Sequence, residues 1–285
     1  MDGGIMAGRI RWGLALACVG ALAACSASKT ASPTTTAPTP KATTSPVAAA
    51  DKTLTILVTN DDGVGAPGID AVVQGLRALP ATKVTVVAPA TNQSGTGGKT
   101  TPGTITAAPA TTASGYPAMA VNGYPADTIT WAIVQHGISF RPDLVVSGIN
   151  FGQNIGPLAG ESGTVGAARA AVAQGIPALA ASQGIDNGMS ADFAEGVTQV
   201  DAWITLHRTA LVDHSYGPVV PAANLNIPSC AGGVVRGPVM APLATSITGI
   251  SITTVNCTST QTSFSNDVAA FINGYAVISP LGTAG

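Results

Sequence analysis

The sequence predicts an α/β domain with a doubly wound, mostly parallel sheet and a C-terminal extension of hairpins or loops. Apolar, β-rich runs alternate with helical patterns along the chain, and each run is continuously apolar instead of alternating with polar residues. Continuous apolar strands are typical of a parallel sheet covered by helices on both faces.

In chain order, strands are predicted where the runs read LTILVT, KVTVVAP, DLVVSG and PALAAS, at residues 54–59, 83–89, 143–148 and 177–182. Helical patterns lie between and after these runs, at residues 69–79, 127–136, 164–174 and 191–209. The segment ANLNIP follows the last helix. Residues 229–265 are rich in Gly, Thr and Pro, which predicts the hairpins or long loops of the extension.

The composition favours one large domain with a closely packed interior. Hydrophobic residues make up 46% of the 285 residues but aromatic ones only 4%, so we expect a core built mainly from small side chains such as Ala and Val. The formal net charge is −2 and the sequence contains no run of basic residues. This charge pattern argues against a nucleic-acid polymer as a partner.

Residues 1–24 predict an export signal. Two arginines precede an apolar segment, Trp12 to Ala24, that is shorter than the roughly 20 residues of a membrane-spanning helix. The segment LAAC ends at Cys25 and resembles the lipobox of bacterial lipoproteins, whose cysteine carries the lipid. We therefore expect a protein at the outer face of the bacterial cell membrane, held there only by its N-terminal lipid. A secreted protein without a lipid is the alternative.

Residues 25–51 contain mostly Ser, Thr, Pro and Ala without a hydrophobic period, which predicts a flexible tether. The folded domain is expected to span residues 52–285. Because Cys18 lies in the signal and Cys25 serves as the anchor, Cys230 and Cys257 remain in an oxidising compartment. We expect them to form a disulfide, and two buried free thiols are the alternative.

The predicted strands end in oxygen-bearing side chains. The first strand runs into Asn60, Asp61 and Asp62, the second is followed by Ser94, and the third ends near Asn150. Ligands of open α/β sheets bind beyond the carboxyl ends of the strands. Adjacent carboxylates in a partly buried cleft need a compensating cation, and a set of oxygen ligands suits Mg²⁺, Mn²⁺ or Ca²⁺. NDDG alone is also a common turn, but its coincidence with two further polar strand ends favours a metal site.

A phosphate site is predicted beside the metal. Ser162, Gly163 and Thr164 lie at the start of the predicted helix at residues 164–174. The free N–H groups and the dipole of a helix N-terminus attract anions. An ordinary Ser/Thr cap is the alternative, and one helix start can serve both purposes.

Several motifs resemble the SurE family of metal-dependent 5′/3′-nucleotidases, also called survival protein SurE. They are ILVTNDDGVGAPGI, VVAPATNQSG, RPDLVVSGINFGQNIG, SGTVGAA and GIPALAAS, followed later by NLNIP and NDVAAFINGYAVISPL. Their order and spacing match the family over nearly all of residues 54–281.

The resemblance implies a Rossmann-like core, a homodimer or higher homo-oligomer, and hydrolysis of nucleoside monophosphates. It implies that the metal ligands are Asp61, Asp62, Ser94 and Asn150, with Asp61 and Asp62 as the catalytic residues. In this interpretation the ion holds a phosphate oxygen and activates a water, which Asp61 orients or deprotonates. Substrate and phosphate contacts are expected from Asn60, Asn154, Ser162, Gly163 and Thr164.

Two departures from the family leave other functions open. Pro157 and Glu161 stand where the family usually has an acidic residue and a Tyr. A lipid-anchored nucleotide-binding or phosphate-binding protein without catalytic activity is therefore one alternative.

A serine esterase is a second alternative. The segment GESGT around Ser162 differs from the G-x-S-x-G nucleophile motif in its last residue, Thr164. The remaining members of a catalytic triad would come from His207 or His214 and from Asp186 or Asp201.

Overall fold

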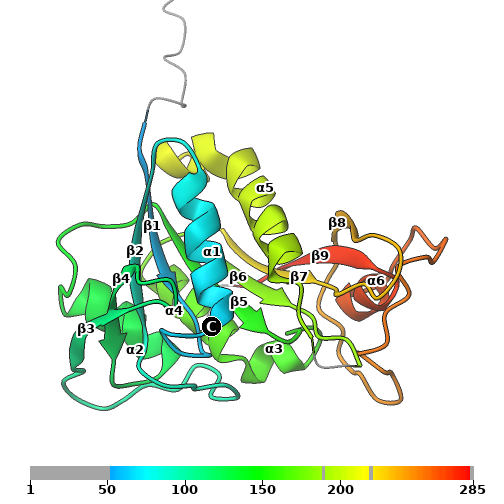
Figure 1. The fold of residues 1–285 in the computed structure, drawn as a ribbon, viewed down its shortest axis with the longest axis horizontal. Coiled ribbons are helices and arrows are strands. Elements are labelled where there is room, and N and C mark those ends of the chain that lie inside the picture. Colours follow the sequence, from blue (N-terminus) through cyan, green and yellow to red (C-terminus); the bar gives the residue numbers. More distant parts are fainter. Residues whose placement is uncertain (1–51, 188–189, 218–220, 283–285) are drawn as a thin grey trace, which may run out of the picture. The chain divides into compact units, whose positions relative to one another are not determined.

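A nine-stranded sheet is the centre of the part of the chain that this computed structural model describes, residues 52–187, 190–217 and 221–282 (Figure 1). The predicted signal peptide, Cys25 and the tether lie outside the described residues. The strands are β1 (Leu54–Thr59), β2 (Thr82–Pro89), β3 (Ala107–Thr111), β4 (Pro117–Val121), β5 (Leu144–Phe151), β6 (Ala178–Gln183), β7 (Ala222–Ile227), β8 (Arg236–Met240) and β9 (Tyr275–Pro280). The helices are α1 (Pro67–Ala78), α2 (Pro125–Ile129), the π-helical η2 (Thr130–Val134), α3 (Leu158–Glu161), α4 (Gly163–Ala173), α5 (Phe193–Val212) and α6 (Asp267–Ile272).

The strand order is β3-β4-β2-β1-β5-β6-β7-β9-β8. Pairing is parallel from β4 through β2, β1, β5 and β6 to β7, which confirms the predicted mostly parallel sheet. Strands β3 and β9 run antiparallel to β4 and β7, and β8 runs parallel to β9. The parallel strands therefore bring their carboxyl ends to one edge of the sheet.

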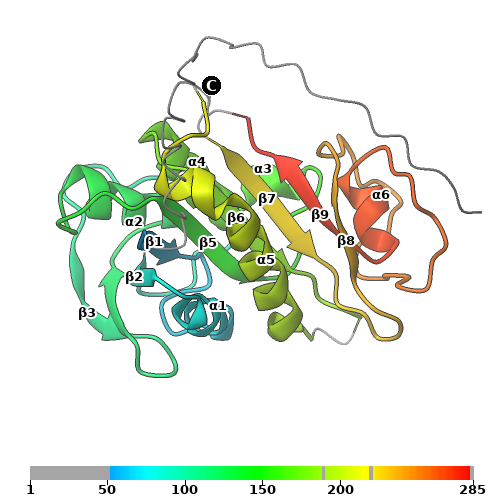
Figure 2. The same ribbon diagram turned by 90° about the horizontal axis from the view of Figure 1, so that it is seen from above.

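Helices cover both faces of the sheet, as the continuous apolar strands predict (Figure 2). Helices α1 and α5 pack on one face, where the spacing of Ile69, Val72, Val73 and Leu76 gives α1 a single apolar side. Helices α2 and α4 pack on the other face. Helix α4 presents mainly Ala and Val to the sheet, so it lies close to the strands.

The predicted helices correspond to α1, α4, α5 and the pair α2 and η2. The expectation of one helix at residues 127–136 is wrong in detail, because the chain changes there from α-helical to π-helical geometry at Thr130. The hairpin of β3 and β4 was not predicted from the sequence. Residues 229–265 form long loops around β8, and β8 pairs in parallel with β9 instead of forming a hairpin.

A third apolar cluster holds the C-terminal segments together. Phe271 and Val268 of α6 are buried there with Val277 of β9, Ile155 and Ala244. Asp267, at the start of α6, is also fully buried. Its Oδ2 accepts a hydrogen bond from Gly156 N at 2.7 Å and its Oδ1 accepts one from Ala244 N at 2.7 Å. The carboxylate thus ties the loop after β5 to the C-terminal segments.

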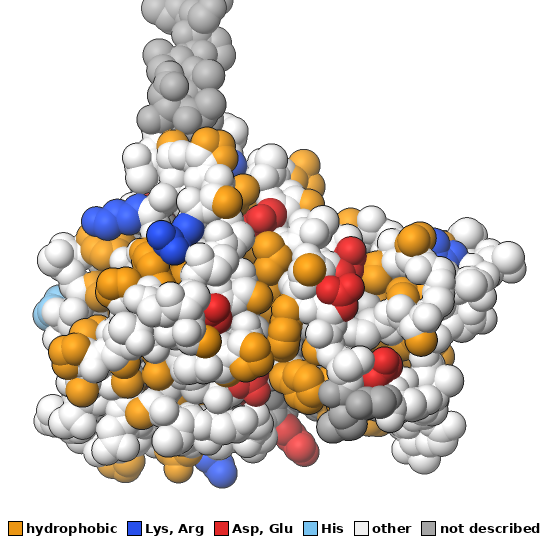
Figure 3. Space-filling view, in the orientation of Figure 1, with side chains coloured by type: hydrophobic (Ala, Val, Ile, Leu, Met, Phe, Trp, Pro, Cys, Tyr) orange, Lys and Arg blue, Asp and Glu red, His pale blue; other side chains and the backbone are white. Residues whose placement is uncertain are grey.

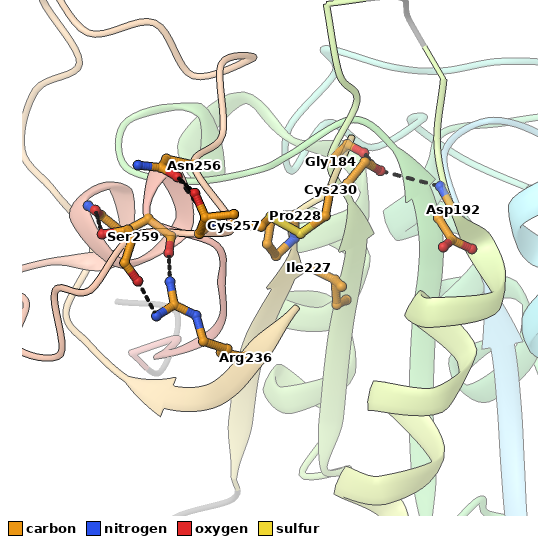
Figure 4. The surroundings of a disulfide bond; sticks show 12 residues. Gly184, Asp192, Ile227, Pro228, Cys230, Arg236, Asn256, Cys257 and Ser259 are labelled. Atoms are coloured by element: carbon orange, nitrogen blue, oxygen red, sulfur yellow. Dashed lines mark hydrogen bonds between the residues drawn. A yellow bond between two sulfur atoms is a disulfide. The ribbon is translucent and has the colours of Figure 1, made fainter. Parts of the chain in front are cut away.

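Cys230 and Cys257 form a disulfide with a Cα–Cα distance of 5.8 Å, which confirms the predicted pairing (Figure 4). The bond joins the chain just after β7 to the loop that precedes α6. Beside it, Arg236 Nη1 donates a hydrogen bond to Ser259 O at 2.5 Å, and the Arg236 guanidinium lies 4.2 Å from the centre of the Tyr275 ring. The disulfide and the contacts of the Arg236 guanidinium therefore hold the loops of the extension in place.

Charged side chains are sparse. On the face shown in Figure 3 the Lys and Arg side chains are scattered and do not gather into a patch. Within the described residues, no helix is both long and apolar enough to cross a membrane.

Candidate metal and phosphate site

A cavity of about 240 Å³ lies at the carboxyl ends of the parallel strands. Asp61 lines it after β1, Ser94 after β2 and Asn150 at the end of β5. Further polar residues of its wall are Gln153, Asn154, Glu161 and Ser162. The structure therefore brings together most of the side chains that the sequence predicts for a metal and phosphate site.

Asp61 is held at the N-terminus of α4. Its Oδ1 accepts a hydrogen bond of 2.6 Å from Thr164 Oγ1, and backbone N–H groups of Gly163 and Thr164 also point to the carboxylate. Gly163 is needed there, because an added Cβ would lie 2.8 Å from Asp61 Cβ. Burial raises the pKa of Asp61, and these hydrogen bonds oppose that rise.

Asp62 points to the neighbouring strand. Its Oδ2 accepts a hydrogen bond from Phe151 N at 3.0 Å. Burial raises the pKa of Asp62 to about 6, the Phe151 hydrogen bond opposes this rise, and the Asp61 carboxylate adds to it. Asp62 lines an adjoining cavity and not the one that Asp61 lines.

The available oxygen atoms fit a hard divalent cation. Two adjacent carboxylates with raised pKa values are the groups that a dication would stabilise in their ionised form. Asn150 Nδ2 donates to Gly152 O at 2.7 Å, which leaves the Asn150 Oδ1 available as a ligand. Ser94 adds an exposed hydroxyl. The described residues contain no cluster of three or more His, Cys, Asp or Glu side chains, so amide and hydroxyl oxygens are needed to complete a coordination shell.

The loop that carries Ser94 is held by backbone hydrogen bonds to Asp61, a predicted metal ligand, and to Glu161. Gln93 N donates to Asp61 O at 2.7 Å, and Ser94 N donates to Asn92 Oδ1 at 2.8 Å. Further along, Gly97 N donates to Glu161 O at 2.9 Å. Ser94 is thereby kept beside Asp61 although its side chain is exposed.

Asn154 is held in place by hydrogen bonds to residues of β6 and β7. Its backbone N–H donates to Asn226 Oδ1 at 2.7 Å, and its carbonyl accepts from Asn224 Nδ2 at 2.8 Å. Its side-chain Nδ2 donates to Ser182 Oγ at 2.9 Å. These supporting residues were not predicted from the sequence, although two Asn at alternate positions of a buried strand are an unusual feature that could have indicated them.

Two residues predicted to contact the substrate have other partners. Asn60 is fully buried and its Nδ2 donates to Gly63 O at 2.9 Å, so it shapes the turn after β1. Thr164 is also fully buried and binds Asp61. Neither side chain lines the cavity: Asn60 and Thr164 position other groups, and Gly163 gives Asp61 room, so contact of these residues with a substrate stays a prediction.

The geometry does not support the serine esterase alternative. Ser162 Oγ accepts a hydrogen bond from Val165 N at 3.2 Å, which makes Ser162 an ordinary helix cap. No histidine lines its cavity within the described residues. His207 Nδ1 lies 2.7 Å from Trp203 O, and His214 Nε2 lies 2.9 Å from Asp143 Oδ1, so both rings have partners elsewhere.

Comparison with known proteins identifies a family. Residues 56–261 match the family of the survival protein SurE. The chain is 38% identical to a 5′-nucleotidase SurE of Methanopyrus kandleri over 166 residues, which is 54% of this chain and 61% of that protein. It is also 38% identical to a 5′-nucleotidase SurE of Pelobacter propionicus over 189 residues, 65% of this chain and 70% of that protein.

A solved structure supports the fold. The crystal structure of the SurE protein from Aquifex aeolicus superposes with a TM-score of 0.63 at 24% identity and covers 81% of this chain and 94% of its own. The family match spans well over half of the present sequence and includes Asp61, Asp62, Ser94 and Asn150. The chain belongs to the survival protein SurE family.

Proposed function

We propose that this protein is a divalent-metal-dependent nucleotidase that hydrolyses nucleoside monophosphates. The observation that carries the proposal is the pairing of Asp61 and Asp62 beside Ser94 and Asn150, next to a cavity whose other wall contains Asn154 and Ser162. The similar proteins of Methanopyrus kandleri and Pelobacter propionicus are each named 5′-nucleotidase SurE, which supports the same substrate class.

A divalent ion bound by Asp61, Asp62, Ser94 and Asn150 would polarise a phosphate oxygen and lower the pKa of a bound water. Asn154 and Ser162, which line the same cavity, would hold the phosphate. The water oxygen forms a bond to phosphorus while the ester oxygen of the nucleoside leaves with the electron pair of the broken bond. Asp61 orients the attacking water and accepts its proton, and the released nucleoside oxygen takes up a proton from solvent.

The test is release of inorganic phosphate from AMP and 3′-AMP with Mg²⁺ or Mn²⁺, with and without EDTA. We expect release that EDTA abolishes and that added metal restores. The variants Asp61→Asn and Asp62→Asn should lose at least about 100-fold in kcat, because each removes a negatively charged ligand. Metal-independent release, or full activity of both variants, would refute the proposal.

A second candidate is a nucleotide-binding protein without catalytic activity. It is motivated by Pro157 and Glu161, which stand where the family usually has an acidic residue and a Tyr, and Glu161 lines the cavity. Calorimetric binding of AMP without phosphate release, under the same metal conditions, would support this candidate over the nucleotidase.

We further propose that the protein is exported, lipid-anchored through Cys25 at the outer face of the bacterial membrane, and a homodimer or higher homo-oligomer. The proposal rests on the LAAC motif and on the family resemblance. Mass spectrometry of the mature protein should find Cys25 modified by lipid at the N-terminus. Light scattering of residues 52–285 should give at least twice the mass of one chain.

A further inference from the structure

We propose that the nucleobase of the substrate binds in the aromatic cavity next to the phosphate site, against Phe151 and Phe193. This inference rests on the proposed function, because it names where the base of the same substrate lies.

The cavity has the size and position of a base-binding site. Its volume is about 490 Å³, which lies in the range of small-molecule sites. Asp62 and Asn92 border it on the side of the metal ligands. Phe151 lines both this cavity and the phosphate cavity, so a ligand that begins at the phosphate site reaches the second cavity across one ring.

The two phenyl rings form an aromatic wall, with Phe151 exposed and Phe193 half-buried against the core. Their centroids are 6.4 Å apart and their planes are tilted by 51°. Phe151 is 40% exposed, so part of its ring faces solvent at the cavity. A purine that stacks on Phe151 would remove this apolar surface from water.

The backbone around the cavity keeps it open. Gly68 lies under the Phe193 ring, and a Cβ at that position would come within 2.9 Å of Phe193 Cε1 and 1.9 Å of Ile149 O. Gly65, at the rim, has no atom near the position of a Cβ. Both glycines line the cavity, so small residues leave the space that the rings face.

One polar group is available to bind the edge of a base. Asn92 Oδ1 accepts a hydrogen bond from Ser94 N, which leaves the two donors of Asn92 Nδ2 for a ligand. The remaining wall is mostly apolar or backbone, including Ala66, Pro67 and Ala90. A wall of this kind favours stacking over recognition of a particular base, so we expect modest discrimination among bases.

The experiment compares AMP with ribose 5-phosphate, which has the same phosphate and sugar but no base. Phe151→Ala should raise KM for AMP about fivefold or more, because stacking of a base on an aromatic ring contributes at least about that factor. Since Phe151 also lines the phosphate cavity, both substrates can lose activity, but the ratio of kcat/KM for AMP to kcat/KM for ribose 5-phosphate should fall about fivefold or more. The substitution keeps the backbone N–H that binds Asp62, so the carboxylate retains its partner.

Three further variants complete the design. Phe151→Trp should preserve the low KM for AMP, and Phe193→Ala should raise it. Phe140→Ala is the matched control, since Phe140 lines a different cavity and lies against Lys83. Phe140→Ala should leave the kinetic constants for both AMP and ribose 5-phosphate unchanged.

The results separate this inference from the proposed function. Equal losses for AMP and ribose 5-phosphate in Phe151→Ala, or no change for either, would overturn the base site while leaving the nucleotidase intact. If the unmodified protein releases no phosphate from either ester, the proposed nucleotidase activity is refuted. Calorimetric binding of adenosine then decides the base site alone: Phe151→Ala should weaken it about fivefold or more, and an unchanged affinity would refute the site.

Discussion

At the scale of single residues, Thr164 supports Asp61, one of the predicted metal ligands. Its hydroxyl donates to the Asp61 carboxylate inside the protein. We expect Thr164→Val to lower kcat for AMP by roughly 10- to 100-fold, because a hydrogen bond to a charged group contributes about 1.5–3 kcal/mol. Steady-state phosphate release measures this effect.

Thr164→Ser is the matched control, since it keeps the hydroxyl. It should retain most of the activity, and the melting temperatures of both variants should show whether the fold is intact. Equal activity of the Val and Ser variants would mean that the hydrogen bond does not position Asp61 for catalysis.

Glu161 allows a test of the electrostatics of the cavity. Its exposed carboxylate lines the wall that faces the phosphate. Glu161→Gln should lower KM for AMP about two- to fivefold at low salt, and the difference should shrink as salt screens the charge. Glu195→Gln, outside this cavity, should leave KM unchanged. An unaltered KM in Glu161→Gln at low ionic strength would contradict the predicted repulsion.

Much of the site could be predicted from residue types alone. Asp61, Ser94 and Asn150 line one cavity because the carboxyl ends of parallel strands meet at one edge, a rule that needs no coordinates. The partner of Thr164 could not be predicted, because residues 61 and 164 are brought together only by the packing of α4 on the sheet. The same holds for the bonds of Asn226 to Asn154.

At the scale of elements, the interface between α1 and α5 contains the carboxyl group of Asp201, one oxygen of which has no hydrogen-bond partner. Gly75 of α1 lets α5 approach, since a Cβ there would lie 2.3 Å from Val197 Cγ1 and 3.3 Å from Asp201 Oδ2. Asp201 Oδ1 is buried without a hydrogen-bond partner. Burial raises the pKa of Asp201 above its usual value of 3.8.

Because the pKa of Asp201 is raised in the folded state, its stability contribution is complete below the pKa of the unfolded state. That contribution is lost as the pH rises through the pKa of the folded state. We therefore expect Asp201→Asn to stabilise the protein at pH 7 by on the order of 1 kcal/mol. The gain should disappear towards pH 3, where the unmodified carboxyl is protonated. Urea unfolding at both pH values measures it.

Asp192→Asn is a useful comparison in the same helix. Asp192 is exposed and caps α5 by accepting from Glu195 N, so its substitution should show no such pH-dependent gain. A destabilised Asp201→Asn variant at pH 7 would show that the ionised carboxylate has a stabilising partner.

The elements that the sequence predicts well are the buried ones. Strands β1, β2, β5 and β6 each contain a run of buried, mostly apolar residues because both of their faces are covered. Strands β3 and β4 at the edge of the sheet include Pro109 and Pro117 and many small residues, so no apolar run reveals them. The change from α2 to η2 has no signal in the local periodicity.

At the scale of the whole molecule, the disulfide of Cys230 and Cys257 secures the loops of the C-terminal extension. It joins residues 27 positions apart, and a loop of this size corresponds to about 3.5 kcal/mol in the chain-entropy treatment. Reduction should lower the free energy of unfolding by this order, as measured by denaturant titration with and without dithiothreitol. Cys230→Ala/Cys257→Ala should not respond to the reductant, and labelling of native free thiols would contradict the bond.

The buried Asp267 carboxylate gives the molecule a single anchor for two distant backbone segments. Because Gly156 N and Ala244 N both donate to it, their amide hydrogens should exchange with deuterated water through one shared opening event. Asp267→Asn should speed the exchange of both amides together, while the amide of Val58 in the central strand keeps its slow rate. The segment that carries Asn154 would then open on the same timescale as α6. Motion of α6 would therefore affect Asn154 in the proposed phosphate site.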